Sequence, residues 1–229
     1  MTLNEQGISD TPAWVVPKAN QYAKDHGKTP FSIYQGKWSV LDRSFERDII
    51  PMARAEGLAL APWDVLGGGK IRSDAEEARR RETGEKGRVI YQPDWERTEE
   101  ERKVCLILEE VAKEVGAENI TSGALAPQCM SASCAEQMYR LVAIAHLLHK
   151  TPYVFPMVGG RKVEHLKQNV QALDISLSPE QIHRIDDAKP LDFGFPYIII
   201  VRTSFESLVR LAEHVNRGIT LQIQSLFHI

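Results

Sequence analysis

The chain lacks the features that mark membrane, disulfide-rich and zinc-binding proteins. Its 229 residues include only three cysteines, Cys105, Cys129 and Cys134, with no C-x-x-C spacing, so neither a disulfide framework nor a zinc site is supported. No stretch approaches the roughly 18 consecutive apolar residues that a membrane span needs. Residues 1–10 have no apolar segment of the kind found in secretion signals. These absences predict a cytoplasmic protein with no membrane partner and no metal.

A strong charge of one sign is also missing. The chain has 28 Lys and Arg against 31 Asp and Glu, a formal net charge of −3, and its cations do not gather into one basic region. The densest charged run, 76–88, mixes both signs and is interpreted as a solvated loop or helix surface. We therefore expect no nucleic-acid partner. A hydrophobic fraction of 43% is ordinary for a globular chain of one large or two small domains.

Strand and helix patterns alternate along the sequence. Short apolar runs predict strands at 31–35, 58–63 and 153–159, and the second run is continuous enough to be buried on both faces. Helical patterns are predicted at 12–27, 42–57, 98–117, 161–173 and 178–189. Alternation with short connections predicts parallel strands and an α/β fold.

Two of these helices carry specific signals. An apolar stripe at helical spacing runs along 98–117, at Val104, Ile107, Leu108, Val111 and Val115. Ser178 is a suitable N-cap for 178–189, with Pro179 at the first helical position and Gln181 where a capping box needs it. Both signals predict helices that are well defined.

The stretch 155–169, FPMVGGRKVEHLKQN, has the pattern of an anion site. Gly159 and Gly160 follow a predicted strand and allow the backbone to approach a ligand closely, and a predicted helix N-terminus comes next. Arg161 and Lys162 place cations beside that positive helix end, which a bound anion would stabilise. Phosphate fits best, because Arg can hold it with two hydrogen bonds. Two solvated surface cations are the alternative.

Several segments together resemble one family. GISDTPAWVV, TPFSIYQGKW, APWDVLGGGK, FPMVGGRKVEHLKQN and LDFGFP are similar, in this order, to the C-terminal half of an aldo-keto reductase. The likeness is greatest to the fungal branch of aryl-alcohol dehydrogenases and norsolorinic acid reductases, and it covers 7–121 and 142–196. The resemblance implies a (β/α)₈ barrel that transfers hydride between NADPH and aromatic or polyketide carbonyls or alcohols in secondary metabolism. This chain would hold a partial barrel, with its predicted strands roughly the sixth to eighth.

The resemblance also implies where NADP would be held. The nicotinamide carboxamide would be bound by the matches Ser9, Asp10 and Gln35, with Asp10 in place of the family's asparagine. Trp63 matches an aromatic residue that stacks on the nicotinamide, although core packing is the alternative. The loop over the pyrophosphate is matched by Leu66, Gly67, Gly68 and Lys70. The segment that holds the 2′-phosphate and adenine is matched by Gly160, Arg161, Lys162, His165, Gln168 and Asn169.

Other motifs are weaker. A solvent-facing helix histidine is the alternative for His165. The GGGK at 67–70 is not a phosphate-binding P-loop, because its flanking residues do not match. His146 and His149 are three residues apart, but the sequence places no third ligand near them, so no metal site is predicted.

The chain departs from the family in three places. The family's catalytic Asp, Tyr, Lys and His come from its first four strands, and no residue here matches them. We therefore assign no catalytic residue, and a non-catalytic NADP-binding protein or a nonfunctional fragment is the alternative. Residues 123–141 are predicted to be an insertion that loops out of a helix, and 197–229 an unrelated tail after a domain at 1–196. We interpret these departures as an incomplete gene model, whose exposed barrel edges would promote self-association.

Overall fold

The computed structural model describes residues 5–85, 94–121, 132–160, 163–195, 197 and 199. Contacts between Cα atoms divide the chain into two compact units, Met1–Leu191 and Asp192–Ile229. All the helices and strands named below lie in the first unit. In the described part of the chain, no helix is both long enough and apolar enough to span a membrane.

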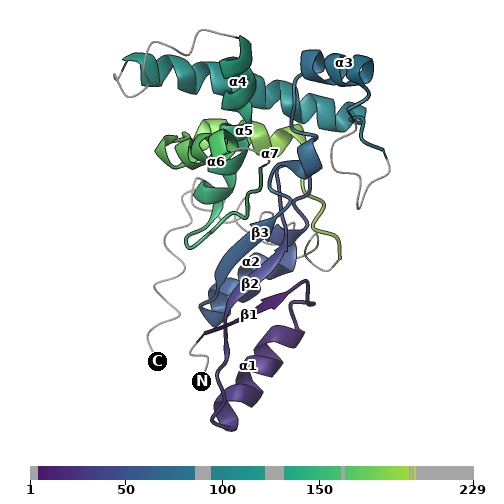
Figure 1. Ribbon diagram of the computed structural model, residues 1–229. Coiled ribbons are helices and arrows are strands. Elements are labelled where there is room, and N and C mark those ends of the chain that lie inside the picture. Colours follow the sequence, from purple (N-terminus) through teal and green to yellow (C-terminus); the bar gives the residue numbers. More distant parts are fainter. Residues whose placement is uncertain are drawn as a thin grey trace, which may run out of the picture. The chain divides into compact units, whose positions relative to one another are not determined.

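Three parallel strands form the sheet, in the order β1 (Gln6–Ser9), β2 (Phe31–Lys37) and β3 (Ala59–Trp63) (Figure 1). Between them run α1 (Val15–Asp25) and α2 (Phe45–Glu56). Each parallel pair is therefore connected through a helix, as parallel pairing requires. The predicted α/β class is confirmed, and two of the three predicted strands are present.

The third predicted strand, 153–159, forms only a single bridge. Val154 pairs in parallel with Leu60, and backbone hydrogen bonds of 2.9 and 2.7 Å flank this pair. Farther along, the Met157 N–H donates to the Pro62 carbonyl at 2.8 Å. Pro62 has no N–H with which to return a hydrogen bond, so the ladder does not continue. The prediction of a full strand is wrong because of a residue in β3 itself.

Two long helices and α7 pack together in the C-terminal half of the unit. α4 (Glu99–Thr121) packs against α5 (Ala132–Lys150) and α7 (Pro179–Ala188). The predicted stripe of α4 faces this contact, because Val104, Leu108, Val111 and Val115 are buried and Ile107 packs against them. The helix prediction and its buried face are both confirmed.

The start of α7 has the predicted capping box. The Ser178 hydroxyl accepts the Gln181 N–H at 3.2 Å, and the Gln181 side-chain oxygen accepts the Ser178 N–H at 2.9 Å. Two N–H groups that the helix cannot satisfy internally are thereby paired. This helix start was predictable because the signal is entirely local.

The predicted insertion, 123–141, does not loop out at its C-terminal end. α5 is continuous from Ala132 to Lys150, and within it Tyr139 and Leu141 are buried. Tyr139 lies three residues before the buried Val142, so it continues the apolar face of the helix. Residues 132–141 are therefore helical rather than looped out, 122–131 lie outside the described residues, and the insertion itself stays a prediction.

The mixed charged run begins in α3 (Asp74–Thr83), where two acids are buried. Glu77 accepts the Nε–H groups of Arg72 and Arg97 at 3.0 and 2.9 Å, and all three side chains are only 1% exposed. Burial alone would raise the pKa of Glu77, but the two arginines outweigh it and lower the pKa to about 2. We name Arg72, Glu77 and Arg97 the Glu77 cluster. Solvated surface is therefore the wrong interpretation for Glu76 and Glu77, because arginines outside the run pair with them, whereas 78–79 and 81–85 are exposed as predicted.

Candidate functional site

Polar side chains meet where the three strands end. The Trp63 indole N–H donates to Asp10 Oδ1 at 3.1 Å, and the Ser9 hydroxyl donates to Asp10 Oδ2 at 2.8 Å. The Asp10 backbone N–H donates to the Gln35 carbonyl at 3.0 Å. Gln35 and Trp63 are half-buried, and Ser9 and Asp10 are exposed. We name these four residues the strand-end group, which is open to solvent at the carboxyl end of the sheet.

Two aspartates, Asp10 of this group and Asp64 next to it, have left-handed backbone conformations. Asp10 follows β1 with a φ of 48°, and Asp64 follows β3 with a φ of 59°. Such angles are uncommon outside glycine, although Asp tolerates them better than most residues. Conformations of this kind cluster at functional sites. The backbone conformations and the polar side chains therefore both indicate a functional site at the carboxyl end of the sheet.

A glycine turn follows β3. The three residues of η1 (Gly67–Gly69) have φ values of 58°, 62° and 90°, which only glycine adopts without strain. A Cβ placed on Gly67 would also lie 2.6 Å from Leu41 Cδ1. The turn therefore needs its glycines, and it presents a backbone surface without side chains.

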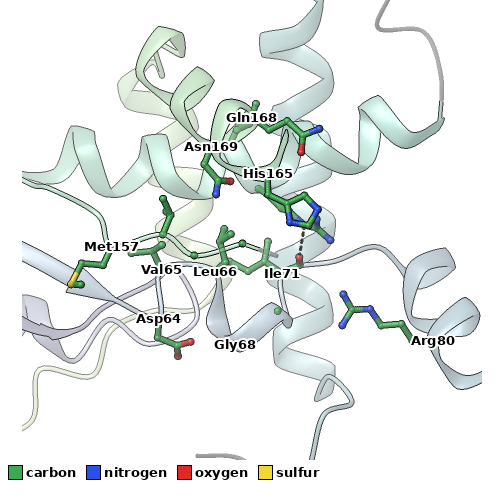
Figure 2. Close-up of a pocket in the computed structure, with 16 residues that line it drawn as sticks. Asp64, Val65, Leu66, Gly68, Ile71, Arg80, Met157, His165, Gln168 and Asn169 are labelled. Atoms are coloured by element: carbon green, nitrogen blue, oxygen red, sulfur yellow. Dashed lines mark hydrogen bonds between the residues drawn. The ribbon is translucent and has the colours of Figure 1, made fainter. Parts of the chain in front are cut away.

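A pocket of about 520 Å³ lies next to this turn (Figure 2). Its walls come from the loop after β3, from α3 and α5, and from a segment that includes α6 (Val163–Val170). The lining residues are Asp64, Val65, Leu66, Gly68, Gly69, Ile71, Arg80, Arg140, Leu141, Met157, Val158, Gly159, Gly160, His165, Gln168 and Asn169. This volume is within the usual range for a small-molecule or cofactor site.

Six of the fourteen residues predicted from the resemblance line the pocket: Leu66, Gly68, Gly160, His165, Gln168 and Asn169. Gly67 belongs to the adjoining turn. The strand-end group is outside this lining but is joined to it, because the Gln35 amide donates to the Met157 sulfur. Arg161 and Lys162 lie outside the described residues.

The side chain of Lys70 is bound elsewhere. Its Nζ lies 3.0 Å from both carboxylate oxygens of Glu101 on α4, and the residue is buried. An ammonium group held by a carboxylate in this way is already neutralised. Lys70 therefore fastens the loop after β3 to α4 in this structure.

Trp63 is not a core residue. The indole is half-buried and anchored through its N–H to Asp10, whereas Trp38 is fully buried and stacks on Phe45 at 5.5 Å between ring centroids. Simple core packing therefore describes Trp38 rather than Trp63. Part of the Trp63 surface stays available to a ligand at the end of β3.

Gly160 and His165 are in close contact at the start of α6. A Cβ built on Gly160 would lie 2.7 Å from the His165 Cβ, so the backbone at 160 accommodates only glycine. His165 is exposed and lines the pocket. The alternative of a solvent-facing histidine is thus correct about its exposure, and the ring also borders the cavity.

Two arginines of the pocket were not among the predicted residues. Arg80 and Arg140 each bind the Glu76 carboxylate at 2.6 Å, through one oxygen each. The i, i+4 spacing of Glu76 and Arg80 was an available signal for a helical ion pair. Nothing in the sequence indicated Arg140, which lies in the predicted insertion.

The histidines considered for a metal site have other partners. His146 Nε2 lies 2.9 Å from Asp186 Oδ1, and His149 Nδ1 lies 2.8 Å from the Ala145 carbonyl. Within the described ranges, no group of three or more His, Cys, Asp or Glu could hold a metal ion.

The chemistry of these residues fits a phosphorylated dinucleotide. Arg80 and Arg140 can bind phosphate oxygens, and the side-chain amides of Gln168 and Asn169 can bind the edge of a base. An indole at the strand ends can stack on a flat ring. The glycine turn between them has no side chains, so a ligand can approach its backbone closely.

Comparisons with known proteins identify related sequences. The model of the aldo/keto reductase family matches residues 3–190. Aryl-alcohol dehydrogenase (NADP⁺) of Phanerodontia chrysosporium is 54% identical over 207 residues, which cover 90% of this chain and 49% of that protein. Norsolorinic acid reductase A of Aspergillus parasiticus is 44% identical over 201 residues, 88% of this chain and 44% of that protein. The chain thus spans about half the length of these curated relatives.

Proposed function

This chain belongs to the aldo/keto reductase family, and we propose that it holds NADP in the pocket beside the Gly67–Gly69 turn. The observation that carries the proposal is that residues matched to the cofactor site, from two segments far apart in the sequence, line one pocket. A relative at 54% identity has NADP⁺ in its name, which supports the choice of cofactor.

The three parallel strands are, in this proposal, consecutive strands of a (β/α)₈ barrel of which the chain spans a part. Their direct order in the sheet supports this, because neighbouring strands of such a barrel follow one another in sequence. In barrels of this type, ligands bind at the carboxyl ends of the strands. The strand-end group occupies that position.

The proposed roles follow from these positions. Trp63 stacks on the nicotinamide, while Ser9 and Gln35 bind its carboxamide. At the other end, Gln168 and Asn169 bind the adenine. Arg161 and Lys162 are proposed to hold the 2′-phosphate on the strength of the resemblance alone. NADP, when bound, supplies or accepts the hydride for an aromatic or polyketide carbonyl or alcohol.

The chain alone is proposed to bind NADP without reducing carbonyls. A general acid needs a proton that it can give up near neutral pH. Burial raises the pKa of Tyr34, whose hydroxyl donates to the Thr11 carbonyl at 2.5 Å. Burial also raises the pKa of Tyr139, whose hydroxyl is bound to Glu76. Both of these tyrosines near the site hold their protons firmly, which favours binding without chemistry.

Two measurements test the proposal. In a fluorescence titration of the full chain, we expect NADPH to bind roughly tenfold or more tightly than NADH, as one charge-assisted phosphate contact would give. In an NADPH-oxidation assay with benzaldehyde, we expect no turnover. Equal affinity for the two cofactors would overturn the NADP assignment. Turnover at about 1 s⁻¹ or faster, an ordinary enzyme rate, would overturn the non-catalytic part.

A further inference from the structure

We propose that Arg80 and Arg140 form a wall of the pocket that adds to the selection of the 2′-phosphate of NADP proposed above for Arg161 and Lys162, and that Glu76 between them limits this contribution. The inference rests on the proposed function, because it assigns roles to further residues of the same pocket. Unlike the proposed function, it is argued from contacts of residues that the family resemblance did not match.

The two arginines come from different helices and converge on one carboxylate. Arg80 of α3 binds Glu76 Oε1 and Arg140 of α5 binds Glu76 Oε2, each through one Nη2 at 2.6 Å. Arg140 Nε also donates to the Ile71 carbonyl at 3.4 Å. A guanidinium group has five N–H donors, so these bonds use a minority of them. The remaining donors are the means by which the wall can hold a second anion.

Arg80 lines the pocket with a mostly buried side chain. That side chain is 12% exposed, and beyond the bond to Glu76 its guanidinium group keeps further N–H donors. A Cβ built on Gly69 would come within 3.9 Å of Arg80 Nη1, so the guanidinium lies beside the glycine turn.

The position of this wall favours the 2′-phosphate over the rest of the cofactor. Met157, which contacts Gln35 of the strand-end group, lies at one end of the pocket in Figure 2. Arg80 lies at the opposite end, with its side chain directed from α3 toward the cavity. The strand-end group is the proposed nicotinamide site. The arginine wall is therefore at the end where the adenosine half would lie.

The charge of the wall gives it the required selectivity. Burial alone would raise the pKa of Glu76, but the charges of Arg140 and Arg80 outweigh it and lower the pKa, so Glu76 is ionised in neutral solution. Two cations and one anion leave a net charge of +1. A phosphate monoester carries about −1.5 to −2 charges at neutral pH, whereas NAD has an uncharged hydroxyl at the same position. Only the phosphorylated cofactor gains from this charge.

The first test replaces Arg140 with Met in the full chain and measures binding by calorimetry. The probes are NADPH and 2′,5′-ADP, compared with NADH and 5′-ADP. We expect Arg140→Met to weaken both 2′-phosphorylated probes by roughly tenfold or more, and the other two by less than about twofold. Arg79→Met is the matched control, because Arg79 is on α3, its side chain is 59% exposed and it is not part of the pocket.

The second test, Glu76→Gln, distinguishes ligand binding from a purely structural role. It removes the competing negative charge and keeps the shape, so we expect affinity for 2′,5′-ADP to rise about threefold or more even if the thermal midpoint falls. A purely structural cluster would instead lose affinity in this variant. If Arg140→Met does not fold, Glu76→Gln decides alone, and unchanged or weaker binding of 2′,5′-ADP overturns the inference.

The outcomes also separate this inference from the proposed function. A parent chain that does not prefer NADPH to NADH overturns both. A parent chain that prefers NADPH, and keeps its full preference in Arg140→Met, overturns only the role of the arginine wall.

Discussion

The Glu77 cluster and the strand-end group are both polar, but the fold uses them differently. In the cluster, the three charged side chains are buried and each is paired with an opposite charge. In the strand-end group, the four side chains bind one another only in part, and each keeps some exposed surface. Polar residues that are buried and paired stabilise this protein, whereas those left partly exposed at the strand ends are available to a ligand.

The largest effect that would test this contrast is expected for Glu77→Gln. The substitution leaves Arg72 buried without its counter-charge and leaves Arg97 with Asp74 as its carboxylate partner, so we expect the free energy of unfolding to fall by about 3 kcal/mol. Urea denaturation measures it, with the exposed Glu96→Gln as control, for which little change is expected. A loss below about 1 kcal/mol for Glu77→Gln would show that the cluster does not stabilise the fold.

The same cluster predicts loss of stability in acid. The pKa of Glu77 is about 2 in the folded protein against an ordinary value of 4.5. Because the folded pKa is the lower one, this stabilisation is complete above about pH 4.5 and is lost as the pH falls toward 2. We expect the free energy of unfolding to fall by up to about 3 kcal/mol over this window. The same measurement on Glu77→Gln should show a smaller acid loss, and an identical curve would exclude Glu77 as the source.

For the strand-end group, the expected effect is on binding. Trp63→Leu removes a ring that would stack on the nicotinamide, a contact of about 1 to 3 kcal/mol by analogy with base stacking, so NADPH affinity should fall roughly tenfold. The free energy of unfolding should change little, since Trp63 is only half-buried. Trp14→Leu is the matched control, because Trp14 is 66% exposed and lies outside both the group and the pocket. Equal loss of affinity in the two variants would contradict the assignment.

The smallest effect is expected for Asp10→Asn. Asn can accept the Trp63 N–H through its oxygen and tolerates the left-handed φ of 48°, so the free energy of unfolding should stay within about 0.5 kcal/mol. It also supplies the amide donor that the family has at this position, so NADPH affinity should rise a few-fold. Calorimetric titration with NADPH and NADH measures the two affinities. A clear loss of NADPH binding would argue against a carboxamide contact at this position.

The parts of the fold that the sequence predicted are those with local causes. The capping box at Ser178 and the stripe of α4 need only nearby residues, so both were found. β1 was too short to give a pattern, so no strand was predicted at 6–9. The bridge at Val154 could not be foreseen, because the effect of Pro62 depends on which segment pairs with β3.

The candidate site divides in the same way. Its glycine turn and α6 residues were predicted because the resemblance is continuous along those segments. Arg80 and Arg140 were not. Arg140 of α5 meets Glu76 of α3 across helices far apart in the sequence, and the spacing of Glu76 and Arg80 within α3 indicates an ion pair but not a pocket. The buried position of Glu77 was hidden for a similar reason, because its partner Arg97 lies in another segment.

The single bridge between Leu60 and Val154 has a consequence for the order of folding. It joins segments that are far apart along the chain, whereas β1, β2 and β3 follow one another closely, so closing it costs more chain entropy. The segment around Val154 should therefore dock after the three-stranded sheet has formed, and detach before that sheet opens. Because Met157 lies on this segment, the pocket would lose one wall each time it detaches, while the rest of the sheet stayed protected from hydrogen exchange.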